Sequence, residues 1–109
     1  MNRRLYADRL QVTEKQLADF CQRWQITELA LFGSVLRDDF GPDSDVDMLV
    51  TFAPSADWSL LDHIQMKQEL VSLLGREVDL VSRRAIDRSE NWIRRREIQR
   101  TAQVVYASR

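Results

Sequence analysis

Three short apolar runs, separated by segments with helical spacing, constrain the fold of this chain more than any other feature. The runs are ITELALFG at residues 26–33, DVDMLVTF at 45–52 and EVDLVS at 77–82. Each has the length of a strand, and the first is apolar at four successive positions, as in a strand buried on both faces. Helical patterns before, between and after these runs predict an α/β or α+β fold, in which helices cover a small sheet.

The expected helices carry start and stop signals. In residues 12–24, Thr13 and Gln16 have the spacing of a capping box, which marks a helix start. A second helix is expected within residues 54–75, ending at Gly75. Its core-facing stripe is predicted to consist of Leu60, Leu61, Ile64, Val71 and Leu74.

The last part of the chain is basic. Asp87 and Glu90 offer a further capping box before a predicted helix at residues 89–102, and residues 104–107 suggest a short final strand. Residues 83–109 hold 8 basic and 3 acidic side chains, whereas residues 1–82 hold 8 basic and 14 acidic ones. The basic part is therefore a candidate for contacting phosphate or an acidic partner, or else a solvated helix face.

Composition narrows the class of protein. The length of 109 residues predicts one domain spanning residues 1–109, and 44% hydrophobic with 30% charged residues is typical of a globular protein. Cys21 is the only cysteine, so an internal disulfide and a cysteine-based zinc site are excluded. No apolar segment follows Arg3 and Arg4, and no run is long enough to span a membrane, so we expect a cytoplasmic protein. The net charge of −1 argues against stable binding of long nucleic acids.

Carboxylates interrupt two of the predicted strands. With a period of two, Asp45 and Asp47 face the same way, with Cα atoms roughly 6–7 Å apart. Asp79 in the third run offers another carboxylate on a neighbouring strand. Three such charges repel one another unless a cation joins them, and oxygen ligands of this kind suit a pair of Mg²⁺ ions. The pattern predicts a metal site formed by Asp45, Asp47 and Asp79.

An anion site is expected beside these carboxylates. Gly33 ends the first strand and would let the backbone approach a phosphate closely, and Ser34 offers an amide and a hydroxyl. Arg37 can add a bidentate phosphate contact. Ser44, in the turn before the second strand, is also predicted to bind the nucleotide cofactor at this anion site. An anion site next to a metal site predicts binding of a metal-bound nucleoside triphosphate.

The spacing of these residues resembles a known family. Gly33-Ser34, ten intervening residues, and the pair Asp45 and Asp47 are similar to the signature of the DNA polymerase β-like nucleotidyltransferase superfamily. The chain resembles its stand-alone minimal nucleotidyltransferases, which are encoded as antitoxins beside HEPN-domain toxins. The resemblance covers nearly the whole chain and implies a mixed sheet flanked by helices.

The resemblance also implies an activity. Asp45 and Asp47 would hold Mg²⁺, and Asp79 would ligate metal and accept the proton of an attacking hydroxyl. The expected reaction is transfer of AMP from ATP to a tyrosine hydroxyl of a HEPN ribonuclease toxin. The chain is expected to form either a homo-oligomer or a complex with that toxin. Two alternatives stay open: an antitoxin that neutralises its partner by binding alone, and a nucleotidyltransferase acting on a small molecule such as an aminoglycoside.

Overall fold

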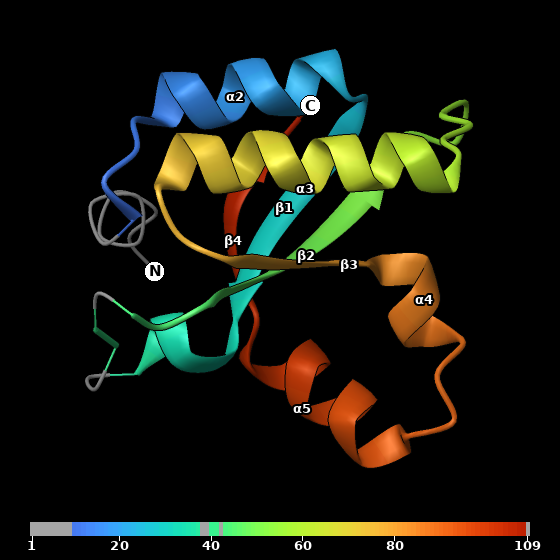
Figure 1. Ribbon diagram of the computed structural model, residues 1–109. Helices are drawn as coiled ribbons and strands as arrows, with labels where there is room; N and C mark the ends of the chain where they lie inside the picture. The colour runs from blue at the N-terminus through green and yellow to red at the C-terminus, as the bar shows by residue number, and fades with distance from the viewer. Residues whose placement is uncertain (1–9, 38–39, 42, 109) are drawn as a thin grey trace.

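The structure is a computed structural model that describes residues 10–37, 40–41 and 43–108. Its elements, in chain order, are α2 (Glu14–Arg23), β1 (Ile26–Phe32), the 3₁₀ helix η1 (Gly33–Leu36), β2 (Val46–Phe52), α3 (Leu60–Leu74), β3 (Val78–Ser82), α4 (Arg83–Asp87), α5 (Trp92–Thr101) and β4 (Gln103–Ala107). Figure 1 shows these elements arranged around a central sheet. Within the described ranges, no helix has both the length and the apolar character needed to cross a membrane.

The described strands form one mixed sheet, with the order β3-β2-β1-β4. The central strand β1 is antiparallel to both of its neighbours, β2 and β4. By contrast, β2 and β3 are parallel, and α3 makes the crossover between them. This arrangement confirms the predicted fold class and places the beginnings of β2 and β3 at the same end of the sheet.

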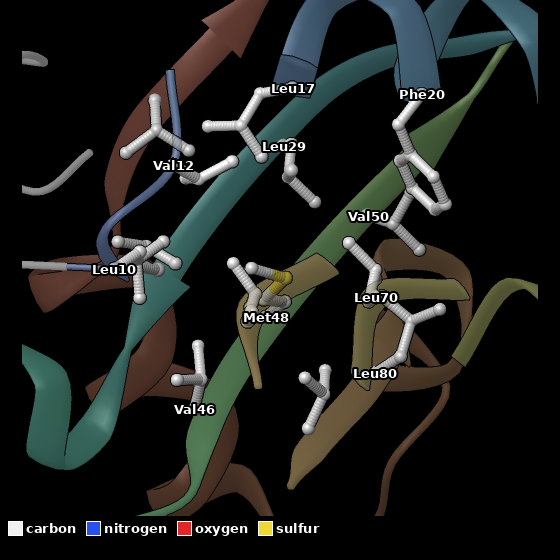
Figure 2. Close-up of a cluster of buried hydrophobic side chains, with 14 of the residues drawn as sticks. Leu10, Val12, Leu17, Phe20, Leu29, Val46, Met48, Val50, Leu70 and Leu80 are labelled. Carbon is white, nitrogen blue, oxygen red and sulfur yellow. The ribbon is translucent and has the colours of Figure 1, made fainter. Parts of the chain in front are cut away.

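Helices cover both faces of the sheet. In Figure 1, α2 and α3 lie side by side over one face, and α4 and α5 lie on the other side of the strands. The larger cluster of buried side chains lies under α2 and α3, and Figure 2 shows part of it. A smaller cluster lies under α4 and α5 and consists of Ala30, Phe32, Leu49, Ile86 and Ile98. The alternation predicted for residues 45–52 is confirmed, because Met48 belongs to the first cluster and Leu49 to the second.

Local signals account for where the longer helices begin and end. The predicted capping box of α2 is present, since Thr13 Oγ1 accepts from the Gln16 amide at 3.0 Å and Gln16 Oε1 accepts from the Thr13 amide at 2.9 Å. Ser59 and Asp62 make the same reciprocal pair at the start of α3. The helix α3 ends as predicted at Gly75, which has a left-handed conformation with φ +69°.

The predicted core stripe of α3 is largely wrong. Leu60 and Leu61 are each 76% exposed and Ile64 is 43% exposed. The helix instead buries Met66, Leu70 and Leu74, and of these three only Leu74 belongs to the predicted stripe. Both sets of residues have helical spacing, so the periodicity of this apolar helix did not determine which side packs on the sheet.

The start of the basic helix also differs from the prediction. A short helix, α4, follows β3 directly, with Ser82 Oγ accepting from the Ala85 amide at 3.1 Å. The helix α5 then begins after Asn91, whose Oδ1 accepts from the Arg94 amide at 3.1 Å. The capping box expected from Asp87 and Glu90 is therefore wrong, because Asn91 caps the helix one residue after Glu90. The final strand at residues 104–107 is confirmed within β4.

Candidate active site

Two of the three predicted carboxylates lie on adjacent parallel strands. Asp47 in β2 pairs in register with Asp79 in β3, so their Cα atoms lie about 4.8 Å apart and their side chains share one face. The face is the one covered by α4 and α5, because Asp47 and the buried Leu49 alternate with residues of the larger core cluster. The structure therefore brings Asp47 and Asp79 together, as the sequence predicted.

Asp45 immediately precedes β2, which begins at Val46, one residue later than predicted. The amide of Val46 donates to the carbonyl of Glu77 at 3.0 Å, which holds this part of the chain against the start of β3. The hydroxyl of Ser34 donates to the backbone carbonyl of Asp45 at 3.1 Å. The residue is thus fixed by its backbone, while its carboxylate remains exposed beside Asp47.

The electrostatics at Asp47 reflect this crowding. Partial burial raises the pKa of Asp47 above its usual range, and the negative charges of Asp79 and then Asp45 raise it further. The positive charges of Arg94 and Arg37 act in the opposite direction. Asp79 and Asp45 are therefore both close enough to repel Asp47, and two arginines from different elements lie close enough to offset part of that repulsion.

Gly33 lies directly against this cluster. It follows β1 with φ +75°, a left-handed conformation that glycine adopts at little cost. A Cβ atom on this residue would clash with the Asp47 carboxylate oxygen Oδ2 and would lie 3.2 Å from its Cγ. Only a residue without a side chain lets the backbone approach Asp47 so closely, which is consistent with the close backbone access that the sequence predicted for this position.

The other predicted nucleotide-binding residues surround the same point. Arg37 follows η1, its amide donates to the Ser34 carbonyl at 3.0 Å, and its side chain is exposed. The Ser44 hydroxyl accepts from the amide of Gly41 at 3.1 Å and closes the turn before Asp45. Pro42 of that turn lies outside the described residues. The structure brings Ser34, Arg37 and Ser44 near the carboxylates, and their contact with nucleotide stays a prediction.

Arg76 belongs to this region and was not predicted from the sequence. Arg76, between α3 and β3, donates from Nη1 to the carbonyls of Gly41 and Ser44, each at 3.0 Å. Its guanidinium lies over the ring of Phe40, 4.4 Å from the centroid. Arg76 therefore holds the turn that leads into Asp45. No local pattern marks it, because its partners lie 35 and 32 residues earlier in the chain.

A cleft opens beside Asp47, between η1 and α5. It has a volume of about 920 Å³, within the range of small-molecule sites. Leu36 and Ile93 contribute apolar lining from opposite sides, and Arg37 and Arg94 contribute positive charge. The cleft therefore has the mixed apolar and cationic lining that a nucleotide requires, directly next to the carboxylates.

The donor set fits a hard cation in chemistry. Within residues 10–37, 40–41 and 43–108, no group of three His, Cys, Asp or Glu side chains is arranged so that it could hold a metal ion by itself. Mg²⁺ is commonly bound through one or two carboxylates, with waters and substrate phosphates as the remaining ligands. The pair Asp45 and Asp47, supported by Asp79, offers oxygen ligands of that kind, and their mutual repulsion is what a cation would relieve.

Comparisons with known proteins found relatives of similar sequence. The chain is 40% identical over 65 residues to the protein adenylyltransferase MntA of Thermococcus cleftensis. The aligned residues cover 60% of this chain and 64% of that protein. The chain thus matches somewhat less than two thirds of the length of this relative. A further relative from Methanocaldococcus jannaschii, also named as a protein adenylyltransferase, is 38% identical over 61 residues, or 56% of this chain and 63% of its own.

Solved structures share the fold. A structure named as a minimal nucleotidyltransferase is 31% identical, with a TM-score of 0.64 and 94% of each chain covered. A toxin–antitoxin structure with AMP-PNP is similar at a TM-score of 0.67, with 17% identity, 90% of this chain and 76% of that one covered. A structure of a tri-AMPylated HEPN toxin with MNT antitoxin from Shewanella oneidensis is similar at a TM-score of 0.61, with 18% identity. The match covers 98% of this chain and 74% of that one.

The family model for the nucleotidyltransferase domain matches residues 13–105. This range contains every element from α2 to the middle of β4, and with them all of the carboxylates, Gly33 and the cleft. The chain belongs to the nucleotidyltransferase domain family.

Proposed function

We propose that this chain is a magnesium-dependent protein adenylyltransferase of the antitoxin type, which transfers AMP from ATP to a tyrosine hydroxyl of a HEPN ribonuclease toxin. The observation that carries the proposal is the in-register pairing of Asp47 with Asp79, with Gly33 against Asp47 and with Asp45 close enough for its charge to act on Asp47. The family match and the names of the relatives support the transfer of a nucleotidyl group.

The residues around Gly33 would bind the triphosphate. Gly33 gives the backbone close access, and Arg37 offers a planar guanidinium suited to paired phosphate oxygens. Asp45, Asp47 and Asp79 would hold two Mg²⁺ ions, which when bound neutralise phosphate charge and favour an ionised nucleophile. The sheet and the turn before it fix the backbone positions of the three carboxylates.

The proposed reaction has one transfer step. The tyrosine oxygen forms a bond to the α-phosphorus of ATP, and the bond from that phosphorus to the bridging oxygen of the β-phosphate breaks. Pyrophosphate leaves, and the hydroxyl proton passes to the Asp79 carboxylate, which is exposed and therefore accessible to an incoming acceptor. The protein contributes positions and charges, and the α-phosphoryl group goes directly to the acceptor.

Two observations support a protein acceptor: a similar solved structure and the exposure of the carboxylates. A structure of similar fold contains a tri-AMPylated HEPN toxin together with its MNT antitoxin. The described residues form one sheet with its covering helices. Asp79 on the edge strand β3 and Asp45 before β2 are exposed, so a large partner could reach them. A protein acceptor that enters from solution is consistent with this arrangement, and we place the reaction in the cytoplasm.

The test is transfer to the cognate toxin. The purified chain is incubated with ATP, MgCl₂ and the HEPN protein encoded beside it, and the toxin is measured by intact mass spectrometry. We expect mass increments of one or more AMP groups, lost on addition of EDTA and on substitution of the acceptor tyrosine by phenylalanine. Asp47→Asn should lower the rate by about 10³-fold, since several kcal/mol of charge stabilisation would be lost.

Asp57→Asn is the matched control, because Asp57 lies in the loop before α3, away from the carboxylates. It should transfer AMP at the rate of the unmodified chain. If no mass is added and Asp47→Asn still neutralises the toxin, the chain is an antitoxin that acts by binding, and the proposal is wrong.

A further inference from the structure

The arginine-rich helix α5 has one side chain whose surroundings differ from those of its neighbours. Arg95 Nη1 donates to the Ser89 carbonyl at 2.6 Å, and Arg100 pairs with Glu97 at 2.8 Å. The guanidinium of Arg94 makes no hydrogen bond or ion pair with the part of the chain that the structure describes, and Arg94 lines the cleft beside Asp47. Of the arginines on this helix, Arg94 is the one that faces the candidate site.

The position of Arg94 is fixed by its backbone. Its amide donates to the capping oxygen of Asn91 at 3.1 Å, and Asn91 itself lines the cleft. One turn further along, the buried Ile98 packs α5 onto the sheet beside Phe32. The helix therefore fixes the backbone of Arg94 beside the cleft that Asp47 also lines.

Arg94 lies across the cleft from Arg37. Both arginines line the same cleft, and Asp47 lines it as well. Arg37 comes from the end of η1 and Arg94 from the first turn of α5. An anion next to Asp47 and its neighbouring carboxylates would thus meet a guanidinium on either side.

The rest of the cleft indicates what such an anion is attached to. Leu36 and Ile93 provide apolar lining, and Ile93 is 65% exposed, so its side chain is accessible to a ligand in the cleft. The volume of about 920 Å³ is large enough for a nucleotide. Glu97 and Thr101 also line the cleft and offer hydrogen-bonding groups further along α5.

We propose that Arg94 is a second phosphate-binding residue, and that the nucleotide is held between η1 and α5 with its phosphates between Arg37 and Arg94 and its nucleoside in the apolar part of the cleft. The inference rests on the proposed function, because it assigns the cleft to the nucleotide rather than to the acceptor. Arg94 would also stabilise the charge that develops as pyrophosphate leaves.

The test compares arginines of the same helix in the full chain. Arg94→Ala, Arg94→Lys and the control Arg96→Ala are titrated with a non-hydrolysable ATP analogue and MgCl₂ by calorimetry, and separately with adenosine. Arg96 is exposed and does not line the cleft. Arg94→Ala should weaken binding of the analogue by about 10- to 100-fold, Arg94→Lys by less, and Arg96→Ala hardly at all.

Adenosine separates phosphate binding from a structural role. It has no phosphate, so Arg94→Ala should bind it as the unmodified chain does. Equal losses for adenosine and the analogue would mean that the cleft had collapsed and would overturn the inference. An unchanged affinity for the analogue in Arg94→Ala, with a raised KM for the toxin, would assign the cleft to the acceptor and also overturn it.

The two proposals fail in different ways. If the unmodified chain binds the analogue and Arg94→Ala does not, yet no AMP reaches the toxin, the proposed acceptor is wrong and the role of Arg94 stands. If AMP is transferred to the toxin and Arg94→Ala behaves as Arg96→Ala in binding and in kcat, the role of Arg94 is wrong and the function stands.

Discussion

The two faces of the sheet differ in what they bury. Under α2 and α3, large side chains from every strand form a continuous cluster, including Leu29, Met48 and Leu70, each fully buried. Under α4 and α5, the buried cluster has five members. On this face, the first parts of β2 and β3 carry Asp47 and Asp79 rather than apolar residues. The first face supplies most of the packing, and the second places repelling charges and an open cleft.

This difference shows how the fold can remain stable although the candidate site contains carboxylates that repel one another. Carboxylates that repel Asp47 lower the stability of the fold, and apolar burial elsewhere has to offset that loss. Because side chains alternate along β2, the same strand serves both needs, with Met48 on one side and Asp47 on the other. Substitutions on the two faces should therefore separate stability from activity.

The largest effect on stability is expected on the face of α2 and α3. Leu70→Ala removes a fully buried side chain and should lower the free energy of unfolding by about 2–5 kcal/mol, measured by urea titration. Leu61→Ala, on the same helix but 76% exposed, should change it by no more than about 0.5 kcal/mol. Nucleotide affinity of folded Leu70→Ala should be unchanged. A tenfold weaker affinity would mean that the two faces are not separable.

A smaller loss of stability with a large loss of activity is expected at Gly33. Gly33→Ala and Gly75→Ala both place a side chain at a positive φ, +75° and +69°, and each should cost about 1–2 kcal/mol. Only at Gly33 would the new Cβ meet Asp47, since nothing lies within 4 Å at Gly75. Gly33→Ala should thus lower the rate of AMP transfer by about 10²-fold and Gly75→Ala should leave it unchanged. Equal rates in the two variants would show that the close approach to Asp47 has no catalytic consequence.

The smallest effect is a gain in stability at Asp47. Without metal at neutral pH, Asp47→Asn removes a partly buried charge that Asp79 and Asp45 repel, so its melting temperature should lie above that of the unmodified chain. Because the folded pKa is raised, stability from the protonated form is present at low pH and lost as pH rises through that pKa. The gain should therefore shrink as pH falls.

With Mg²⁺ present, the melting temperature of the unmodified chain should instead lie above that of Asp47→Asn. Addition of MgCl₂ should raise the melting temperature of the unmodified chain and leave that of Asp47→Asn unchanged. Asp57→Asn should follow the unmodified chain throughout. A lower melting temperature for Asp47→Asn at neutral pH without metal would mean that the carboxylate stabilises the fold, contrary to the repulsion seen at this site.

The sequence predicted those parts of the molecule that depend on short-range patterns. The capping box at Thr13, the left-handed end of α3 at Gly75 and the alternation around Met48 involve residues a few positions apart, so one stretch of sequence contains both partners. The convergence of Asp47 and Asp79 was also predictable. Aspartate is disfavoured inside an apolar strand, so its presence in two such strands indicates one shared site.

Long-range choices could not be predicted in the same way. The predicted face of α3 was wrong in its first half, because Ile64 and Met66 both belong to plausible stripes and only packing on the sheet decides between them. Arg76 and Arg94 were missed for a related reason. A lone arginine gives no signal of what it lies near in the fold. The turn that contains Gly41, which Arg76 contacts, and Asp47, which shares the cleft with Arg94, are both far away in sequence.

The parallel pairing of β2 with β3 has a consequence for how the protein becomes active after synthesis. Parallel neighbours cannot be joined by a tight hairpin, so Asp47 meets Asp79 only after α3 has formed and crossed the sheet. A partly synthesised chain, or one in which this crossover has opened, holds Asp45 and Asp47 but lacks the third carboxylate beside them. Catalytic competence would therefore arise late in folding and vanish early in unfolding, which ties the onset of activity to a completed tertiary structure.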